Sequence, residues 1–486
     1  MSVDASEAPA KLAKPTHRWR WHFDPTHSPP VGDGSSATGL SAEPQALAQF
    51  LSADTLKQLA RQSQAGDVRE RKLTCVVFFW LTVLAFGPGG PATLHQLLSY
   101  VVSAMLLAGF SLSSATLSKE ALSENFRERP WQYFAAVLHH LLQSHAALWQ
   151  HLAGLPNPLV VEQLQVQLID ATSMKVATKL FSLFPGRATG KREHWAGVKL
   201  HLGWRLFRSV PEVLALSAEK QNALKTDFIR PKGEAVLYIF DLEYWAYHLF
   251  DRIIAHEQHF LSRLRHDCNP PILAVRQGDP AWVGKRLKEI ELRGTLVDLV
   301  VRLRGSHPQH PQMHYDVRFI GHWLERDQIW HLDVTSLMDS LNYPVLLLVD
   351  LYRLRWQIEM LFRNLKCVLR LANFVATGEN GIRIQIYAAL IHYVLTHLVM
   401  LKAMQQTGRP LEDFSIPYCL QAVQQVLTQT HALTLQGQPL DANALASSLV
   451  NAVIRLGLRP NRKRVRLITT VQQNIASARA APARTP

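Results

Sequence analysis

The spacing of apolar and polar positions changes near residue 160. Before that point the pattern is helical, and we predict helices near residues 45–64, 68–86, 92–109, 114–127 and 131–153. The second helix is separated from the third by Gly87-Pro-Gly-Gly-Pro91, because glycine and proline interrupt helices. The first third of the chain is therefore predicted to be helical.

After residue 160 the residue pattern is typical of β-strands, which are predicted at residues 166–176, 197–207, 210–218 and 235–241. The second and third are predicted to be antiparallel. The fourth is a buried type of strand that ends in a carboxylate, with a helix after it. This order is that of an RNase H-like sheet, which would place Asp170 and Asp241 side by side on neighbouring strands. For each aspartate alone, a turn or capping role is the alternative.

The interval between Asp241 and Glu359 is longer than an undecorated RNase H-like core needs. It begins with a predicted helix, from Tyr244 to about Arg265, and continues with a mainly β insertion at about 266–340. Strands are predicted there at residues 270–274, 296–303, 314–320 and 328–334.

After the insertion, a long apolar helix is predicted from Ile382 to about Met404, and two or three helices within residues 410–454. The fold class is therefore α/β: an RNase H-like mixed-sheet core with a β-rich insertion, flanked by an N-terminal helical domain and C-terminal helices. The predicted domains are a flexible basic and aromatic arm (1–44), a helical domain (45–156), the RNase H-like core with its insertion (160–405) and C-terminal helices with a basic tail (406–486).

Composition narrows the classes of partner. The 486 residues are 48% hydrophobic, which indicates a globular protein, and carry a net charge of +14. Such a charge favours a polyanion, most simply nucleic acid, although basic proteins also bind membranes and acidic substrates. The four cysteines are scattered, which predicts neither a zinc cluster nor a disulfide scaffold and suits a reducing cytosol. We expect no signal peptide and no membrane span.

Basic side chains concentrate at the two ends of the chain. Residues 442–486 contain cations but no aspartate or glutamate, and we expect Arg462, Lys463 and Arg464 to contact phosphates. In the N-terminal arm, residues 17–23 alternate cations with aromatic rings, a pattern that suits phosphates and stacked bases. The alternative for both segments is a solvated tail.

Further DNA contacts are predicted in the middle of the chain. The helix after Ser113 and Ser114 resembles the reader of a helix-turn-helix motif, and an ordinary helical bundle is its alternative. In the insertion, Arg302, Arg304 and Arg318 alternate along predicted strands and could face DNA. The DNA-facing side chains of the helix would be Lys119, Asn125, Arg127 and Arg129.

Residues 350–366 contain no glycine or proline and are predicted to form one helix. Tyr352, Arg355, Glu359 and Lys366 would share one face of it, because spacings of three, seven and fourteen residues return to nearly the same direction. A plain surface helix with an Arg–Glu pair is the alternative.

The spacing Tyr352-x2-Arg355-x3-Glu359-x6-Lys366 resembles the Y-R-E-K signature of the insertion-sequence transposases of family four. Those enzymes have an RNase H-like DDE core. The resemblance implies that Glu359 is the third metal-binding carboxylate and that the tyrosine, arginine and lysine contact phosphates at the transposon end. It also implies an N-terminal helical DNA-binding domain and a β insertion.

Asp170 and Asp241 match the two aspartates of that family. One position departs from the pattern, since Glu243 stands where the family often has glycine. It would be either an extra carboxylate near the site or a helix-capping residue.

The chemistry implied is DNA cleavage and strand transfer in cut-and-paste transposition. Two Mg²⁺ ions, with Mn²⁺ as a substitute, would be held by Asp170, Asp241 and Glu359. The partners would be double-stranded DNA, as terminal inverted repeats and target, and a second copy of the chain on paired ends, in a bacterial cytoplasm at the nucleoid. The alternatives are an inactivated or repurposed sequence-specific DNA-binding protein and a simple Mg²⁺-dependent nuclease.

Overall fold

The structure is a computed structural model, which describes most of the chain between residues 51 and 459. The described ranges are 51–67, 73–90, 93–108, 117–144, 164–187, 195–206, 210–303, 313–325, 327–371, 373–409, 413–435 and 442–459. The predicted arm at 1–44 and the tail cations Arg462, Lys463 and Arg464 lie outside them.

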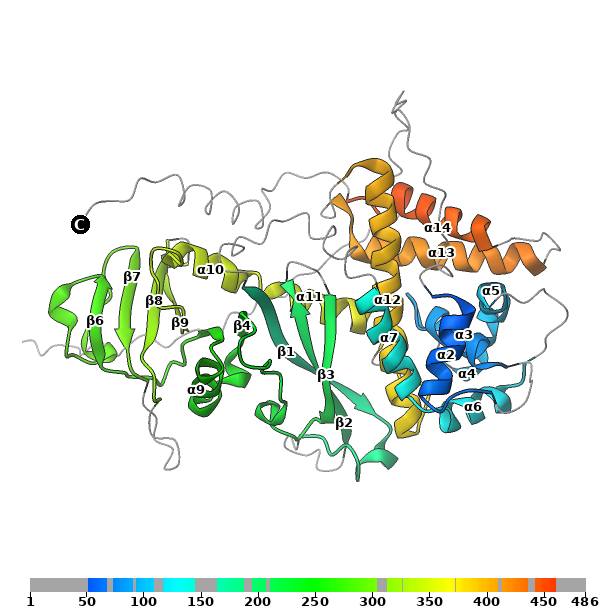
Figure 1. Cartoon of the computed structure of the whole chain (residues 1–486), viewed down its shortest axis with the longest axis horizontal. Helices are drawn as coiled ribbons and strands as arrows, with labels where there is room; N and C mark the ends of the chain where they lie inside the picture. The colour runs from blue at the N-terminus through cyan, green and yellow to red at the C-terminus, as the bar shows by residue number, and fades with distance from the viewer. Residues whose placement is uncertain are drawn as a thin grey trace, which may run out of the picture. The chain divides into compact units, whose positions relative to one another are not determined.

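A mixed sheet forms the centre of the described chain (Figure 1). Its nine strands are β1 (Gln165–Val176), β2 (Ala196–Arg205), β3 (Val210–Ala218), β4 (Val236–Phe240), β5 (His259–Arg263), β6 (Ile272–Gln277), β7 (Leu296–Val301), β8 (Val317–Leu324) and β9 (Ile329–Thr335). Their order is β3-β2-β1-β4-β5-β9-β8-β7-β6. The pairs β1–β4 and β4–β5 are parallel and the others antiparallel. The predicted RNase H-like mixed sheet is confirmed.

The predicted helix at residues 244–265 is wrong in its second half. Helix α9 (Tyr247–Ala255) ends after nine residues, and Glu257 adopts a left-handed backbone conformation with φ of 60°. The chain then turns into β5, whose Phe260 and Leu261 are buried. A strand of five residues with two core side chains is too short to give a clear period in the sequence.

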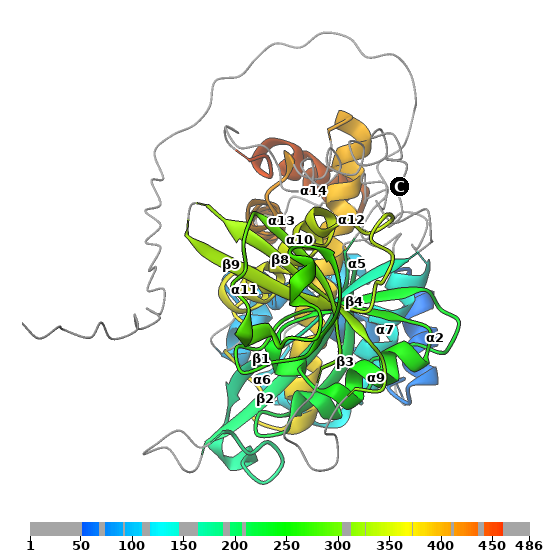
Figure 2. The ribbon, with the colours of Figure 1, turned by 90° about the vertical axis from the view of Figure 1, so that its left-hand side faces the viewer.

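The β-rich insertion extends the same sheet. Strand β9 pairs with β5, so β6 to β9 continue the RNase H-like strands in one sheet. Helix α10 (Val345–Arg353) contacts β5, β7 and β8, and Figure 2 shows it beside this part of the sheet. The insertion therefore supports the segment that leads into the signature residues.

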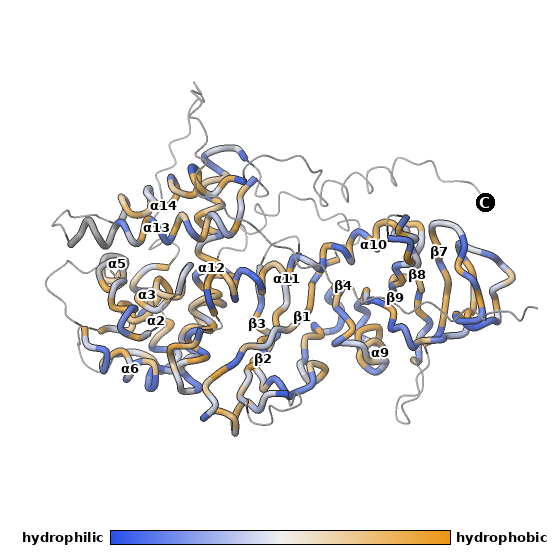
Figure 3. The backbone as a smooth tube through the Cα atoms, turned by 180° about the vertical axis from the view of Figure 1, so that it is seen from behind, coloured by the Kyte–Doolittle hydropathy of each residue, from blue (hydrophilic) through white to orange (hydrophobic). Residues whose placement is uncertain are grey.

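The helices before and after the sheet share one hydrophobic core around α12 (Glu379–Thr407). The others are α2 (Ala53–Gln62), α3 (Cys75–Ala85), α4 (Leu94–Leu97), α5 (Val101–Leu107), α6 (Lys119–Glu128), α7 (Gln132–Ser144), α13 (Ile416–Leu435) and α14 (Ala442–Leu456). Helix α12 contacts α3, α6, α7, α13 and α14. By length and composition it could cross a membrane, but its most apolar window is entirely buried among the other helices. Figure 3 shows the hydropathy along the backbone of these helices.

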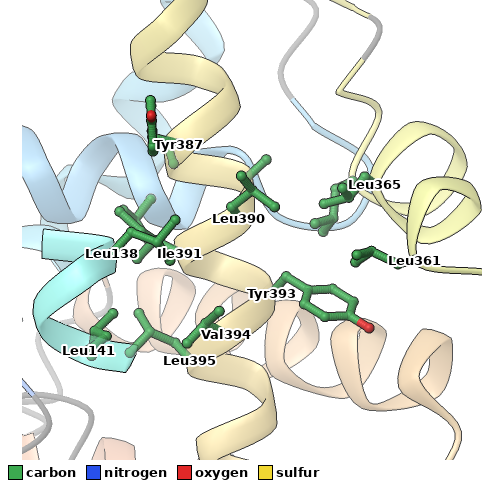
Figure 4. Close-up of a cluster of buried hydrophobic side chains, with 14 of the residues drawn as sticks. Leu138, Leu141, Leu361, Leu365, Tyr387, Leu390, Ile391, Tyr393, Val394 and Leu395 are labelled. Atoms are coloured by element: carbon green, nitrogen blue, oxygen red, sulfur yellow. The ribbon is translucent and has the colours of Figure 1, made fainter. Parts of the chain in front are cut away.

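Helix α12 also supports the signature segment. Leu361 and Leu365 lie on one side of α12, and Leu138 and Leu141 of α7 lie on the other (Figure 4). All four side chains are at most 3% exposed. Burying a leucine contributes about 1.5–3 kcal/mol, so this packing holds the signature segment firmly against the helical core.

The prediction of a single helix at 350–366 is wrong. Helix α10 ends at Arg353, α11 spans Trp356–Arg363, and a π-helical turn follows at Asn364–Val368. Between the helices the backbone hydrogen bonds tighten to three-residue spacing, as from Arg355 N–H to the Tyr352 carbonyl. The four signature side chains therefore do not follow the angles of one regular helix.

Arg318 does not face DNA, which corrects the sequence prediction. Its side chain is fully buried and donates two hydrogen bonds to Asp298, from Nε at 2.8 Å and from Nη2 at 2.6 Å. It also donates to the Tyr343 carbonyl at 2.6 Å, just before α10. Strand β8 is buried at five successive positions from Val317, so Arg318 points into the fold, where a carboxylate and a carbonyl take the place of water as its hydrogen-bond partners.

Two of the side chains assigned to a DNA-reading helix also have structural roles. Arg129 binds the Asp67 carboxylate and the backbone carbonyls of Ala65 and Leu73, while Asn125 accepts a hydrogen bond from Arg129. Helix α6 begins after Ser118, whose hydroxyl accepts from the Ala121 N–H. Lys119 and Arg127 are exposed on α6.

Candidate functional site

Asp170, within β1, and Asp241, directly after β4, lie at the same level of two neighbouring parallel strands. Strand β1 pairs with β4 so that Ile169 lies opposite Phe240, and each aspartate is the next residue along its strand. Asp170 is 8% exposed. Asp241 caps a short 3-10 turn, Leu242–Tyr244, by accepting the Glu243 N–H on Oδ1 at 2.9 Å. The register thus brings the two predicted carboxylates together.

Arg355 links Glu359 to this pair. Its Nη1 lies 3.6 Å from Asp170 Oδ2, and its Nη2 donates a short hydrogen bond to Glu359 Oε1. Helix α11 contacts β1, and its buried Ile358 belongs to the same hydrophobic cluster as Leu168 of β1. The guanidinium therefore pairs with carboxylates from two separate parts of the chain, and the predicted residues Asp170, Asp241, Arg355 and Glu359 form one charged cluster.

The electrostatics of the cluster favour a bound positive charge. Burial, together with the negative charge of Asp241, raises the pKa of Asp170 from 3.8 to about 7. The Ala171 N–H and Arg355 oppose that rise. Burial also raises the pKa of Asp241, opposed mainly by the Glu243 N–H. Two desolvated carboxylates that disfavour each other's ionisation are stabilised by a cation.

Carboxylate oxygens are the ligands preferred by hard divalent cations. The donor set Asp170, Asp241 and Glu359 matches that preference. Within the part of the chain that the structure describes, no three aspartate, glutamate, histidine or cysteine side chains are already gathered around one cation position. Arg355, paired with two of the three carboxylates, has to yield them for an ion to bind all three.

Tyr352 lies between two arginines. The Cζ atoms of Arg263 and Arg355 are 5.2 Å and 5.8 Å from its ring centroid, and its side chain is largely buried. Burial raises the pKa of its hydroxyl to about 12, so the phenol stays protonated and can donate a hydrogen bond. Arg263 was missed in the sequence because it ends β5, the strand interpreted there as helix.

Arg263 also meets a buried carboxylate on the next strand. Its Nε lies 3.6 Å from Asp333 Oδ1, and Asp333 is 2% exposed. Burial raises the pKa of Asp333 from 3.8 to about 7, although Arg263 opposes the rise. The folded protein therefore holds this proton more tightly than the unfolded chain does.

Asp333→Asn is expected to weaken the pH dependence of stability. Because the folded pKa is raised, the wild-type free energy of unfolding falls as pH rises from about 4 to about 7. Between pH 5 and pH 8 the wild type should lose roughly 2–3 kcal/mol more than the variant. Urea unfolding at both pH values measures this, and equal losses in the two proteins would contradict it.

Lys366 reaches the first strand. Its Nζ donates to the Ser173 carbonyl at 2.9 Å, and burial lowers the pKa of its ammonium. The π-helical turn displaces it from the face predicted for a regular helix. Arg302, by contrast, is a partly exposed residue directly after β7, and its Nε donates to Asp316 Oδ1 at 2.6 Å.

Glu243 is neither a free carboxylate nor the capping residue of the turn. Its Oε1 accepts from Lys199 Nζ at 2.6 Å and lies 3.6 Å from Arg187 Nη2. Asp241 provides the cap. Lys199 is a second residue that sequence reasoning missed. A lysine inside an otherwise apolar strand run was the available signal, because buried lysines are rare unless paired.

Comparison with known proteins adds an independent finding. The family model described as a transposase DDE domain matches residues 162–395, the range that holds all three carboxylates. The chain is 27% identical over 207 residues to the y4zB protein of Sinorhizobium fredii (strain NBRC 101917 / NGR234), whose name includes the word transposase. That match covers 42% of this chain and 53% of the relative, so it spans about half the relative's length.

Two further relatives have names that refer to insertion sequences. The transposase for insertion sequence element IS231F of Bacillus thuringiensis subsp. israelensis is 21% identical over 335 residues, which is 61% of this chain and 68% of the relative. A Geobacillus stearothermophilus protein, also named for transposition of an insertion sequence element, is 23% identical over 308 residues, covering 62% and 71%.

Proposed function

Since residues 162–395 belong to the transposase DDE domain family, we propose that this chain is an insertion-sequence transposase that binds transposon ends, cleaves DNA and transfers the cut strand to a target. The observation that carries the proposal is the convergence of Asp170, Asp241 and Glu359 around Arg355. The Y-R-E-K spacing of the same segment supports it.

The proposed cofactor is Mg²⁺, with Mn²⁺ as a substitute, held by Asp170, Asp241 and Glu359. When bound, two such ions activate the attacking oxygen and stabilise the departing one. The two strands and α11 supply one carboxylate each, so the site depends on the packing between sheet and helix. Asp170 is buried, which strengthens the charge interactions around it, whereas Asp241 and Glu359 are partly exposed.

Arg355 is proposed to exchange its carboxylate partners for a DNA phosphate. A guanidinium can bind phosphate with two parallel hydrogen bonds, as it binds a carboxylate. If Asp170 and Glu359 held an ion, Arg355 would be released from them and could bind a phosphate beside them. Tyr352 would donate its hydroxyl hydrogen to a phosphate oxygen, and Lys366 would supply a point charge.

The DNA duplex would extend from this site over the basic surfaces. We propose that the helical region predicted at 45–156 reads the terminal inverted repeat and that a homodimer pairs the two ends. The side chains proposed to contact the phosphate backbone of the DNA are Lys119, Arg127, Arg302, Arg462, Lys463 and Arg464. Phosphate contacts of this kind weaken as salt rises.

The test is a cleavage and joining assay. Purified protein is incubated with Mg²⁺ and a labelled duplex ending in the inverted repeat that flanks its own reading frame, with a supercoiled target plasmid present. End-specific cutting followed by joining to the plasmid is the expected result. Cutting without joining would indicate a nuclease, and binding without cutting in Mg²⁺ and Mn²⁺ would indicate a DNA-binding protein; either would overturn the proposal.

A further inference from the structure

We infer that Lys199 is a positioning residue: by binding Glu243 it fixes the short turn that presents Asp241 to the carboxylate site. The inference rests on the proposed function, because it concerns how one proposed metal ligand is held. It concerns residues outside the Y-R-E-K segment and the three carboxylates.

The Lys199–Glu243 pair is built into the fold. Lys199 lies on β2 and its side chain is 3% exposed, while Glu243 is 30% exposed. Their contact is 2.6 Å, a charge-assisted hydrogen bond of near-optimal length. A buried ammonium needs such a partner, because an unpaired charge away from water is costly. Glu243 is therefore held at a fixed point above β2.

The same turn is held at a second point. His201, two residues after Lys199 on β2, faces Tyr244, with 3.4 Å between Nδ1 and the phenol oxygen. Its Nε2 lies 2.9 Å from Ser217 Oγ on β3. Residues two apart on a strand share a face, so β2 binds consecutive residues of the turn with consecutive side chains of that face.

This anchoring acts on the sheet face opposite the carboxylate cluster. Ile169 and Tyr244 belong to one hydrophobic core, whereas Leu168 and Ile358 of α11 belong to the other. Asp170, which follows Ile169, faces α11. The turn therefore carries the chain from Asp241, near Arg355, to the far face, where Lys199 fixes it.

The connection to Asp241 is direct. The Glu243 N–H donates to Asp241 Oδ1 at 2.9 Å, so the position of Glu243 sets the orientation of that carboxylate. Lys199 and Arg187 both pair with the Glu243 side chain, which keeps Glu243 from acting as a ligand itself. Groups that orient a metal ligand typically change metal affinity by 10–100-fold when removed.

The experiment compares Mn²⁺ binding to the full-length protein on its inverted-repeat duplex, measured by electron paramagnetic resonance of free Mn²⁺. The variants are Lys199→Met, Lys199→Arg and Glu243→Gln. Lys232→Met is the matched control, because Lys232 belongs to a Lys–Glu pair outside the site. Its Nζ lies 2.9 Å from Glu257 Oε1, and both side chains are exposed. Thermal unfolding and metal-free DNA binding are measured in parallel.

Lys199→Met and Glu243→Gln are expected to bind Mn²⁺ roughly 10-fold more weakly than the wild type. Lys199→Arg should restore most of the affinity, and Lys232→Met should leave it unchanged. DNA binding without metal should be the same in all of them. If Lys199→Met unfolds at the assay temperature, Glu243→Gln decides, because it keeps the shape of a partly exposed side chain.

Mn²⁺ affinity in Lys199→Met equal to or higher than that of the wild type would overturn the inference. A gain would mean that Lys199 competes with the ion for Glu243 as a ligand. A wild-type protein that binds no Mn²⁺ would instead overturn the proposed function, and the inference with it. The two failures are thus distinguished by the wild-type measurement alone.

Discussion

Replacing Glu359 with glutamine, or Asp170 or Asp241 with asparagine, is expected to reduce Mg²⁺-dependent cleavage of the inverted-repeat duplex by more than about 100-fold. Loss of a group that only orients a metal ligand costs up to about 100-fold, and loss of the ligand itself should cost more. Each change removes a ligand charge while keeping the side-chain shape. Binding of the DNA end should remain, because it depends on arginines and lysines. Gel-shift and cleavage assays on the same preparations separate the two steps.

A single variant that still cleaves at the wild-type rate would remove its residue from the site. Asp251→Asn is a suitable matched control. That carboxylate lies on α9 and pairs with His314 Nδ1 at 2.8 Å, outside the cluster. The Asp251→Asn variant should cleave DNA at the wild-type rate. Loss of cleavage in the control as well would indicate a general effect of altering the fold.

Arg318→Met is expected to destabilise the protein by about 3–5 kcal/mol, the usual cost of breaking a buried ion pair from one side. The change leaves Asp298 buried without its partner and removes the hydrogen bond to the Tyr343 carbonyl at the start of α10. Urea unfolding measures the effect. The double variant Arg318→Met, Asp298→Asn should recover part of the lost free energy of unfolding, because it no longer has a buried unpaired carboxylate.

Arg302→Met provides the comparison, because Arg302 was assigned to DNA by the same strand alternation. Its pair with Asp316 is more than one third exposed on both sides, so its loss should destabilise the protein far less than the loss of the Arg318 pair. Its effect should instead be a weaker salt dependence of DNA binding. Equal destabilisation by the two substitutions would contradict the buried role of Arg318.

Those site residues that lie in segments with a clear local pattern could be predicted from the sequence. The runs before Asp170 and Asp241 have the composition of buried strands, so the strand order could place the two aspartates next to each other. The signature segment supplied Arg355 and Glu359 by spacing. The sheet order and the contacts of Arg355 agree with that expectation.

The features that could not be predicted from the sequence depend on contacts between distant segments. An arginine on an alternating strand has the same local pattern whether it faces solvent or Asp298, and only the fold distinguishes the two. The division of the signature helix into α10 and α11 reflects tightened backbone hydrogen bonds near Arg355, where propensity favours a continuous helix. Lys199 was missed because its partner, Glu243, lies on another element.

The most direct measurement counts Mn²⁺ ions bound to the complex of the full-length protein with its DNA end. Two ions per active site are expected in the wild type, as two-metal phosphoryl transfer requires. In the variant Asp170→Asn, Asp241→Asn, Glu359→Gln none is expected at the same Mn²⁺ concentration, with DNA still bound. Equal Mn²⁺ binding by the two proteins would contradict the claim that these three carboxylates form the metal site.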